Sequence, residues 1–480
     1  MTNNLFPKAC DVHIMYYGQK CIVLDVDNNI IFNTDSDFGM YLQGAEKNDR
    51  DEPFTARLKA LNEYGVFKKN NIEEKAPYYN PIYKLSIEAY HGCNLSCVYC
   101  YGKSSGVYHN TGTYANFESL KDTINYFIND FGKEAKSYEI NIVGAGEPLL
   151  NFKLVKELKV YCDELQQEIG KPIIFWVATN GTVFTEEIID FFLNERQGLS
   201  ISLDGPAEIH DELRPYSNGN GSHEIIAKWI ERIVEKSKGK GGLENFWVST
   251  VVTSKHKSII DIVKHLRVLG VHNAQIRPIK TVNTGYTLTQ ESVESIKMRY
   301  EELINYLIEQ AIQGDFDDLK IVLNDRDFWG RHVIRVLERY KINYRCGAAR
   351  SKLNVLANGD IYPCDMSADI SELKLGNIKD GINKDKAYPF FNQEVSQKNA
   401  CKECWCRYYC GGGCYVSAYL HNGDISIPDK IKCELVKKLV ELAIFFVNEV
   451  QTRSPENFEK IKRYIKISRN MRNSIYGIKI

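Results

Sequence analysis

The feature that most limits the fold of this chain is a regular alternation of strand-like and helix-like segments between residues 84 and 314. Six runs rich in β-branched and aromatic residues are separated by runs with an amphipathic helical pattern. The strand-like runs begin near residues 83, 137, 173, 199, 246 and 273. Because a helix is the usual link between parallel strands, this order predicts an α/β fold. We expect a partial (β/α)6 barrel, with a doubly wound open sheet as the alternative. Both place chemistry beyond the carboxyl ends of the strands.

The segments on either side of this core have different patterns. Residues 1–75 combine the hairpin-like stretch "KCIVLDVDNNIIFNTD" with a helical run that stops near Gly65, which suits a small winged-helix-like unit. Two prolines in residues 73–81 indicate a linker. Residues 340–440 are rich in Cys and Gly and poor in periodic apolar pattern, so we expect an irregular region that needs metal to fold. Residues 441–480 are expected to be helical and charged.

Composition narrows the class of protein. The 480 residues carry a formal net charge of −1, so we expect neither nucleic acid nor an anionic membrane as an obligatory partner. The N-terminus lacks a basic segment followed by an apolar run, and the short apolar stretch at 439–447 contains Glu441. We therefore expect no signal peptide, no membrane span and a cytoplasmic location. In such a reducing compartment, clustered cysteines among the 14 are expected to be metal ligands or catalytic thiols.

The stretch "YHGCNLSCVYCYG" at residues 90–102 places Cys93, Cys97 and Cys100 in a short loop directly after the first strand. A structural zinc ion takes four ligands, and a cubane iron–sulfur cluster usually takes four cysteines, one for each iron. Three cysteines therefore leave one iron of a cubane open to a substrate or cofactor. A zinc knuckle with a distant fourth ligand is the alternative.

The spacing of this loop resembles the signature of radical S-adenosylmethionine (SAM) enzymes. "GAGEPLL" (144–150) follows the second strand, where that family carries a Gly-Gly-Glu-Pro motif, and Ala145 is a departure from it. The resemblance implies that the backbone near Gly146 and the Glu147 carboxylate bind the SAM ammonium. A turn with a solvated acid is the plainer interpretation of the motif by itself.

Two later strand ends, "ATNGT" (178–182) and "SISLDGP" (200–206), also look like this family. The resemblance implies that Asn180 and Ser202 lie near the SAM ribose or carboxylate. It also implies that Arg214 pairs with that carboxylate through its planar guanidinium. An Asn or Ser at a strand end is equally often a cap or a turn residue.

A second group of cysteines resembles the seven-cysteine SPASM extension of radical SAM enzymes. Its members are Cys346, Cys364, Cys401, Cys404, Cys410, Cys414 and Cys433. The resemblance implies two auxiliary four-iron clusters, and thus three 4Fe-4S clusters in all. The outer one would be held by Cys401, Cys404, Cys410 and Cys433. The inner one would receive Cys346, Cys364 and Cys414, and "YKINYRC" offers no further cysteine just before Cys346. Either the inner cluster has an open iron or it recruits Cys406. A pair of zinc ribbons would explain the paired spacing alone.

Asp365 follows Cys364 in "YPCD". Related sulfatase-maturing enzymes use an aspartate here as a base, so the resemblance implies a catalytic role. The alternative is a carboxylate that accepts backbone N–H bonds beside the cluster.

The family resemblance also implies a reaction. SAM would be cleaved by one electron, from a reductant such as flavodoxin or ferredoxin, and the resulting 5′-deoxyadenosyl radical would abstract a hydrogen atom. The N-terminal module resembles the element that binds the leader segment of a precursor peptide as an added strand. We therefore expect a peptide maturase that forms a thioether between a cysteine sulfur and a carbon. The alternatives are formylglycine formation on a sulfatase, carbon–carbon cross-linking of a peptide, and electron transfer without catalysis.

Overall fold

We describe a computed structural model of the chain, covering residues 7–18, 20–44, 52–68, 81–100, 115–144, 146–193, 197–238, 245–280, 285–368 and 370–478. The chain forms two compact units, each built from segments far apart in the sequence. The core unit comprises residues 80–330, 347–392 and 460–480. The amino-terminal unit comprises residues 1–79, 331–346 and 393–459. The expected linker at 73–81 lies outside the described residues except for Pro81.

The core unit contains six parallel strands in sequence order. They are β4 (Ile82–Ile87), β5 (Ser137–Ile142), β6 (Ile173–Thr179), β7 (Gln197–Ser202), β8 (Phe246–Val252) and β9 (Ala274–Pro278). Each pairs with the next in parallel register. The alternation expected from the sequence is thus confirmed. Because the strands are parallel, their carboxyl ends meet at one edge of the sheet.

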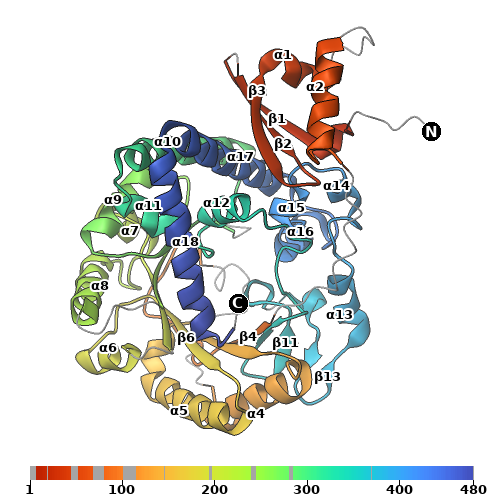
Figure 1. The fold of residues 1–480 in the computed structure, drawn as a ribbon. Helices are drawn as coiled ribbons and strands as arrows, with labels where there is room; N and C mark the ends of the chain where they lie inside the picture. Colours follow the sequence, from red (N-terminus) through yellow and green to blue (C-terminus); the bar gives the residue numbers. More distant parts are fainter. Residues whose placement is uncertain are drawn as a thin grey trace. The chain divides into compact units, whose positions relative to one another are not determined.

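Helices lie along the outer face of this curved sheet (Figure 1). They are α4 (Phe117–Tyr126), α5 (Phe152–Ile169), α6 (Glu186–Phe192), α7 (Ala207–Leu213), α8 (His223–Ser237) and α9 (Ile259–Val268). The sequence explains their orientation. In α8, the buried residues Ile226, Ile230 and Ile233 share one helical face. The side chain of Thr185 caps the first turn of α6. Helices α10 (Gln290–Gln313) and α11 (Asp317–Val322) also belong to the core unit, whereas nearly all of α12 (Gly330–Leu337) belongs to the amino-terminal unit.

Four short strands extend the sheet beyond β4. They are β10 (Lys352–Val355), β11 (Asp360–Tyr362), β12 (Gly376–Asn377) and β13 (Gly381–Ile382). Only β10 is parallel to its neighbour β4, and the other three are antiparallel. The sequence predicted an irregular region here, because strands of two to four residues are too short to show alternation. Within the described residues the ladder runs in one line from β13 to β9, and no pairing joins these two ends.

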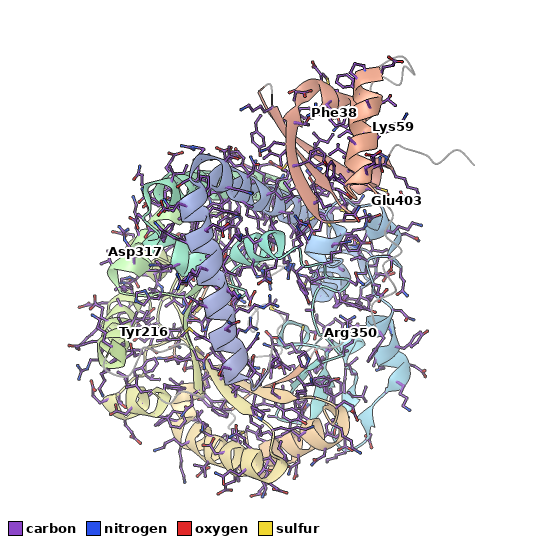
Figure 2. The ribbon with its side chains drawn as sticks, viewed as in Figure 1. Phe38, Lys59, Tyr216, Asp317, Arg350 and Glu403 are labelled. Carbon is purple, nitrogen blue, oxygen red and sulfur yellow. The ribbon has the colours of Figure 1, made fainter. Side chains whose placement is uncertain are left out.

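The amino-terminal unit contains a three-stranded antiparallel sheet in the order β1 (Val12–Tyr17), β2 (Lys20–Asp25) and β3 (Ile30–Asp35). The β2–β3 hairpin confirms the hairpin expected around residues 27–29. Helices α1 (Ser36–Leu42) and α2 (Glu52–Glu63) complete this module. Phe38 is fully buried in its core, whereas Lys59 lies on the exposed face of α2 (Figure 2). Sequence analysis missed β1, which forms the third strand.

The rest of the amino-terminal unit carries most of the late cysteines. It includes α14 (Asn399–Lys402), α15 (Arg407–Cys410), α16 (Tyr415–Asn422) and α17 (Lys430–Arg453). Helix α13 (Lys384–Phe391) belongs to the core unit, and α18 (Pro455–Ile475) begins in the amino-terminal unit and ends in the core unit. None of the helices in the described residues is long and apolar enough to cross a membrane.

Within the amino-terminal unit, the three-stranded sheet packs on the cysteine loop around Arg407. The Arg407 guanidinium lies 2.7 Å from Asp11 Oδ1 and 2.6 Å from Asp27 Oδ1. The ring of His13 stacks on Trp405 with centroids 3.6 Å apart. These contacts join the N-terminal module to the loop that carries four late cysteines.

Candidate active site

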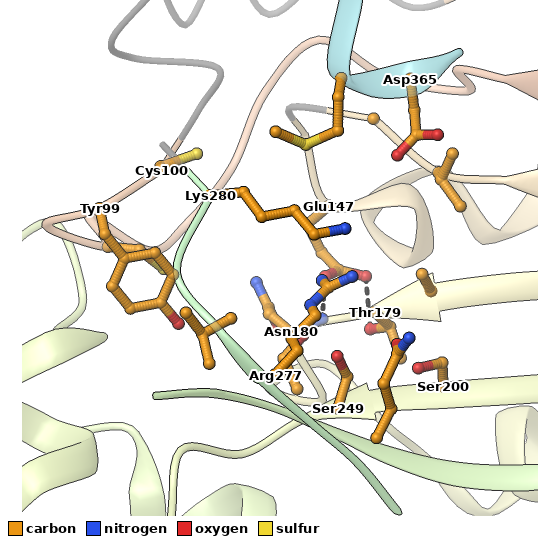
Figure 3. Close-up of a pocket in the computed structure, with 18 of the residues that line it drawn as sticks. Tyr99, Cys100, Glu147, Thr179, Asn180, Ser200, Ser249, Arg277, Lys280 and Asp365 are labelled. Atoms are coloured by element: carbon orange, nitrogen blue, oxygen red, sulfur yellow. Dashed lines mark hydrogen bonds between the residues drawn. The ribbon is translucent and has the colours of Figure 1, made fainter. Parts of the chain in front are cut away.

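A cavity of about 340 Å³ lies in the core unit (Figure 3). All six parallel strands, or the loops that follow them, contribute to its wall, as expected for a site at the carboxyl ends of parallel strands. The sequence-predicted residues at the wall are Cys93, Cys97, Cys100, Gly146, Glu147, Asn180, Ser202, Arg214 and Asp365. The structure therefore brings these nine expected site residues together, whereas Cys364 of the same unit is not part of this wall.

Close backbone contact fixes the cysteine loop against the segment after β5. The Glu147 N–H donates to the Gly92 carbonyl at 2.7 Å. A Cβ atom at Gly146 would lie 2.0 Å from the Tyr90 carbonyl oxygen, so only glycine fits there. The second glycine of the "GAGEP" motif is thus required because a larger residue would clash with the backbone of the cysteine loop. Ala145, the departure from the family motif, lies outside the described residues.

The Glu147 carboxylate is buried and accepts three hydrogen bonds. Its donors are Thr179 Oγ1 at 2.6 Å, the Asn180 N–H at 2.6 Å and the Leu149 N–H at 3.0 Å. Burial raises the pKa of Glu147, and these hydrogen bonds act in the opposite direction. The carboxylate is held in one orientation at the cavity wall, where it can face a cation.

The amide of Asn180 connects the end of β6 to the cysteine loop. Its Nδ2 lies 2.9 Å from Asn94 Oδ1 and 3.6 Å from Cys93 Sγ. Its Oδ1 accepts from the Thr182 N–H at 2.9 Å. Asn180 therefore positions Cys93, a role that sequence analysis did not assign.

Arg214 belongs to a buried polar chain beside the cysteine loop. Its Nη1 donates to the Tyr99 hydroxyl at 3.0 Å, and Tyr99 in turn donates to Asp204. Arg214 is 8% exposed, and its Nε has no hydrogen-bond partner among the described residues. A buried donor without a partner is costly, so this atom suits an anionic group within the cavity. Ser202 lies at the end of β7 and lines the same wall.

Asp365 lies at the cavity wall but pairs with a lysine. Lys352 Nζ is 2.5 Å from its Oδ1. Burial alone would raise the pKa of Asp365, but the charge and hydrogen bond of Lys352 hold it at about 2. The sequence signal for Asp365 was its position after Cys364, and nothing in the sequence pointed to Lys352.

The first three thiols form one electrostatic group. Burial raises the pKa of Cys97 to about 11, the Arg214 charge opposes this shift, and Cys100 and Cys93 reinforce it. Three half-buried thiols beside a guanidinium suit an anionic thiolate-bound cluster. The chemistry of the donor set therefore fits an iron–sulfur cluster with SAM beside it. Within the described ranges, no three His, Cys, Asp or Glu side chains converge on one metal-ion position.

The expected outer ligands form a second electrostatic group, in the amino-terminal unit. Burial raises the pKa of Cys433 to about 12, and Cys410, Cys401 and Cys404 act in the same direction. The fully buried Cys406 interacts with Cys410, Cys404 and Cys433. Cys406 therefore lies near the expected outer ligands.

The expected inner ligands are divided between the two units. Cys346 and Cys414 belong to the amino-terminal unit, and Cys364 belongs to the core unit. Their grouping around one cluster stays a prediction. Ser367 Oγ lies 3.7 Å from Cys364 Sγ.

Comparison with known families gives the identity of the two cysteine regions. The model of the radical SAM superfamily matches residues 87–244, and the model of the SPASM iron–sulfur cluster-binding domain matches residues 346–405. The chain contains a radical SAM domain and a SPASM domain. The resemblance to radical SAM enzymes with a SPASM domain is thus confirmed. Because these domains indicate an enzyme, electron transfer without catalysis is set aside as the function of this chain. This radical SAM enzyme binds SAM and iron–sulfur clusters.

Three relatives illustrate what this radical SAM enzyme is similar to. The serine-type anaerobic sulfatase-maturating enzyme of Bacteroides thetaiotaomicron is 24% identical over 376 residues, covering 73% of this chain and 86% of the relative. The structure of anSMEcpe with bound AdoMet is 23% identical, has a TM-score of 0.61, and covers 80% of this chain and 98% of its own. Streptococcus suis SuiB bound to precursor peptide SuiA is 16% identical, has a TM-score of 0.50, and covers 89% of this chain and 99% of its own. The two structural likenesses establish the fold.

Sequence analysis missed several residues that line the cavity and also Asp204, which lies beside it against Tyr99. Thr179 and Asp204 were inside quoted motifs, but a threonine or aspartate at a strand end has many uses. Arg277 and Lys280 also line the cavity, at the end of β9 and just after it. No sequence motif marked either of them.

Proposed function

We propose that this enzyme installs a thioether cross-link in a ribosomally made precursor peptide. The observation that carries the proposal is the position of Cys406 among the outer thiols. It leaves Cys346, Cys364 and Cys414 as the available protein thiols for the inner cluster. Three thiols leave one ligand position for the peptide's own cysteine, since soft sulfur is a preferred ligand of iron. The full complement would then be three 4Fe-4S clusters.

When bound, SAM and the first cluster would supply a 5′-deoxyadenosyl radical that removes a hydrogen atom from a substrate carbon. The peptide thiolate would then bond to that carbon, and the one electron left over would pass to the auxiliary cluster. The side chains of the protein would orient SAM. Glu147 faces the SAM ammonium while three donors hold its carboxylate in place. The free Nε of Arg214 suits the SAM carboxylate. Asn180 positions Cys93. Asn180 and Ser202 would also lie near the ribose of SAM.

The leader segment of the peptide would bind the N-terminal sheet. In the order β1-β2-β3, strand β3 (Ile30–Asp35) is an edge with no further strand beside it in the described residues. On the opposite edge, β1 packs its side chains His13 and Tyr17 against Trp405 and Phe445 of the same unit. Strand β3 is therefore our choice for an added peptide strand.

The test is co-expression with a short cysteine-bearing peptide encoded in the neighbouring reading frame, followed by mass spectrometry. A thioether removes two hydrogen atoms and leaves the cysteine resistant to alkylation. The same mass change with free thiols would instead assign a carbon–carbon cross-link. An unchanged peptide mass would refute both. Flavodoxin or ferredoxin, in a cytoplasmic setting, would be the reductant.

Formylglycine formation on a sulfatase has comparable support. Asp365 lies at the cavity wall, where a base for this reaction is required. The similarity to a sulfatase-maturating enzyme covers most of the chain. A synthetic sulfatase peptide with a central Cys or Ser distinguishes the two functions. An aldehyde that reacts with a hydrazide probe would favour this alternative over the thioether.

A further inference from the structure

Among the charged side chains that line the active-site cavity, the positive ones outnumber the negative ones. The lining includes two carboxylates, Glu147 and Asp365. Glu147 is held by three internal donors, and Asp365 is paired with Lys352, which is not part of the lining. On the positive side the lining holds Arg214, Arg277, Lys280 and Arg326. The cavity wall thus has more positive groups than negative ones, and its carboxylates already have partners.

Three of these positive groups have interactions within the protein, and the charge of Lys280 acts on Asp365. Arg214 donates to Tyr99 beside the cysteine loop. Arg326 stacks over Trp176 with its guanidinium carbon 4.0 Å from the ring centroid. Its Nη2 also lies 3.7 Å from Glu139 Oε2. Both arginines therefore contribute to the walls of the site.

Arg277 differs from the other two arginines. It is only half-buried, on β9, and among the described residues its side chain has neither a carboxylate nor a hydrogen-bond partner. Figure 3 shows Arg277 and Lys280 projecting from the same stretch of chain into the cavity. The hydroxyl of Ser249, on neighbouring β8, also lines this wall. A planar guanidinium with a hydroxyl beside it suits the two oxygens of a carboxylate.

The proposed function already assigns the SAM carboxylate to Arg214, which follows β7, two strands away from β9 in the strand order. We propose that Arg277 binds the carboxylate of an Asp or Glu side chain in the substrate peptide, next to the residue that loses a hydrogen atom. The inference rests on the proposed function only in taking a peptide as the substrate. It assigns Arg277 as a specificity residue, with Lys280 adding positive charge to the same wall.

The experiment uses reconstituted, SAM-loaded enzyme and three pools of synthetic dodecapeptides. The first pool fixes one Asp, the second fixes Asn at that position, and both have blocked ends and no other acidic residue. The third is the Asn pool with a free C-terminal carboxylate. Retained peptides are separated by gel filtration and counted by mass spectrometry. We expect about tenfold more retention of the Asp pool than of the Asn pool, as one charge-assisted contact would give.

Substitutions at Arg277 test whether its guanidinium causes the preference for the Asp pool. Arg277→Gln should reduce the ratio of Asp to Asn retention to about one, and Arg277→Lys should keep part of it. Arg232→Gln is the matched control, because Arg232 lies on exposed α8, pairs with Glu186 and does not line the cavity. It should retain the wild-type ratio. Cluster absorbance shows whether each variant keeps a formed site, and SAM affinity, measured without peptide, shows whether the substitution affects SAM binding.

Five results would overturn the inference. Equal retention of the Asp and Asn pools would do so, as would an Asp preference that survives Arg277→Gln. Selective retention of the third pool alone would assign the site to a peptide C-terminus. A tenfold loss of SAM affinity in Arg277→Gln would assign the guanidinium to SAM. If the wild-type enzyme retains no pool at all, the peptide substrate itself is refuted. An Asp preference without any thioether would leave this inference standing and remove only the proposed cross-link.

Discussion

Tyr99 donates a hydrogen bond to Asp204, a residue 105 positions later in the chain. Tyr99 immediately precedes the last cysteine of the first loop, and Asp204 follows β7. Asp204 also accepts from the Val251 N–H at 2.9 Å, so one buried carboxylate joins the cysteine loop to two strands. The aromatic residue of the cysteine loop thus has a polar function as well as an apolar one.

Replacing Tyr99 with Phe tests this connection. The variant leaves the Asp204 carboxylate and Arg214 without the hydroxyl between them, in a fully buried position. We expect the free energy of unfolding to fall by about 1–3 kcal/mol, the usual cost of an unsatisfied buried group. Thermal unfolding of the reconstituted protein measures the change. Tyr64→Phe is the control, because Tyr64 is 86% exposed. Equal midpoints for the two variants would contradict the prediction.

Gly146→Ala tests the backbone contact beside the cysteine loop. The added Cβ would lie 2.0 Å from the Tyr90 carbonyl oxygen, so the loop must move. We expect the variant to lose about one cluster's worth of iron, because ligand thiols must be held in place. Iron and sulfide analysis after reconstitution provides the measurement. At Gly285 an added Cβ meets nothing within 4 Å, which makes Gly285→Ala the matched control. Full iron content in Gly146→Ala would refute the steric argument.

Glu147→Gln tests the role of the buried carboxylate. The amide keeps the shape but removes the negative charge, and its NH₂ group faces donors. We expect SAM affinity to fall by about 10- to 100-fold, since a charged hydrogen bond contributes about 1.5–3 kcal/mol. Equilibrium binding of SAM to the reconstituted enzyme measures this loss, and the cluster absorbance shows that the cluster is present. Glu157→Gln, on the exposed face of α5, is the control. Unchanged SAM affinity would remove Glu147 from the SAM site.

Acid should destabilise the core unit through His210. Its Nδ1 accepts the Asp204 N–H at 3.1 Å, and its Nε2 lies 3.0 Å from Ser222 Oγ. Burial lowers the pKa of His210 from 6.5 to about 2, and the charges of Arg214, His223 and His265 act in the same direction. Below pH 6.5 the unfolded chain therefore binds a proton that the native protein does not bind.

The effect of His210 protonation on the free energy of unfolding is large enough to measure. Between pH 7.5 and 6.0, His210 alone should remove about 0.8 kcal/mol from the free energy of unfolding. The thermal midpoint of His210→Gln should therefore fall less between pH 7.5 and 6.0 than that of the wild type. At pH 7.5 the midpoint of the variant should be the lower of the two. His272→Gln, at an exposed position, should follow the wild-type pH dependence. A variant at residue 210 with the full wild-type pH dependence would show that this histidine does not contribute.

Arg407→Ala should loosen the N-terminal module within its unit. The guanidinium is 6% exposed and contacts both Asp11 and Asp27, so its removal leaves two carboxylates unpaired. We expect a loss of about 2–4 kcal/mol, reduced from that of a fully buried pair because Asp27 is partly exposed. Limited proteolysis should cleave within residues 1–79 faster than in the wild type. Lys402→Ala, at an exposed position in the same loop, provides the comparison. Equal cleavage rates would show that other contacts hold the module.

Much of the core was readable from the sequence because its elements are long and periodic. Helix α5 and strand β6 repeat their apolar pattern over enough residues to be recognised. Strands β12 and β13 have two residues each, which is too short for any period. Strand β1 was missed because the apolar Met15 follows Ile14 directly and interrupts the alternation.

At the site, residues inside motifs could be found, and residues outside them could not. Glu147 and the first three cysteines were marked by spacing and by their position after strands. Lys352 and Arg277 became visible only in three dimensions, because their partners or surroundings come from distant segments. The same holds for Cys406, whose neighbours in space decide to which set it belongs.

The contact of Arg407 with Asp11 and Asp27 has a consequence for protein engineering. A chimaera that exchanges only the first 79 residues would present a foreign surface to this guanidinium. Transfer of substrate range between relatives should therefore succeed when the loop from Cys401 to Cys410 travels with the N-terminal sheet as one cassette.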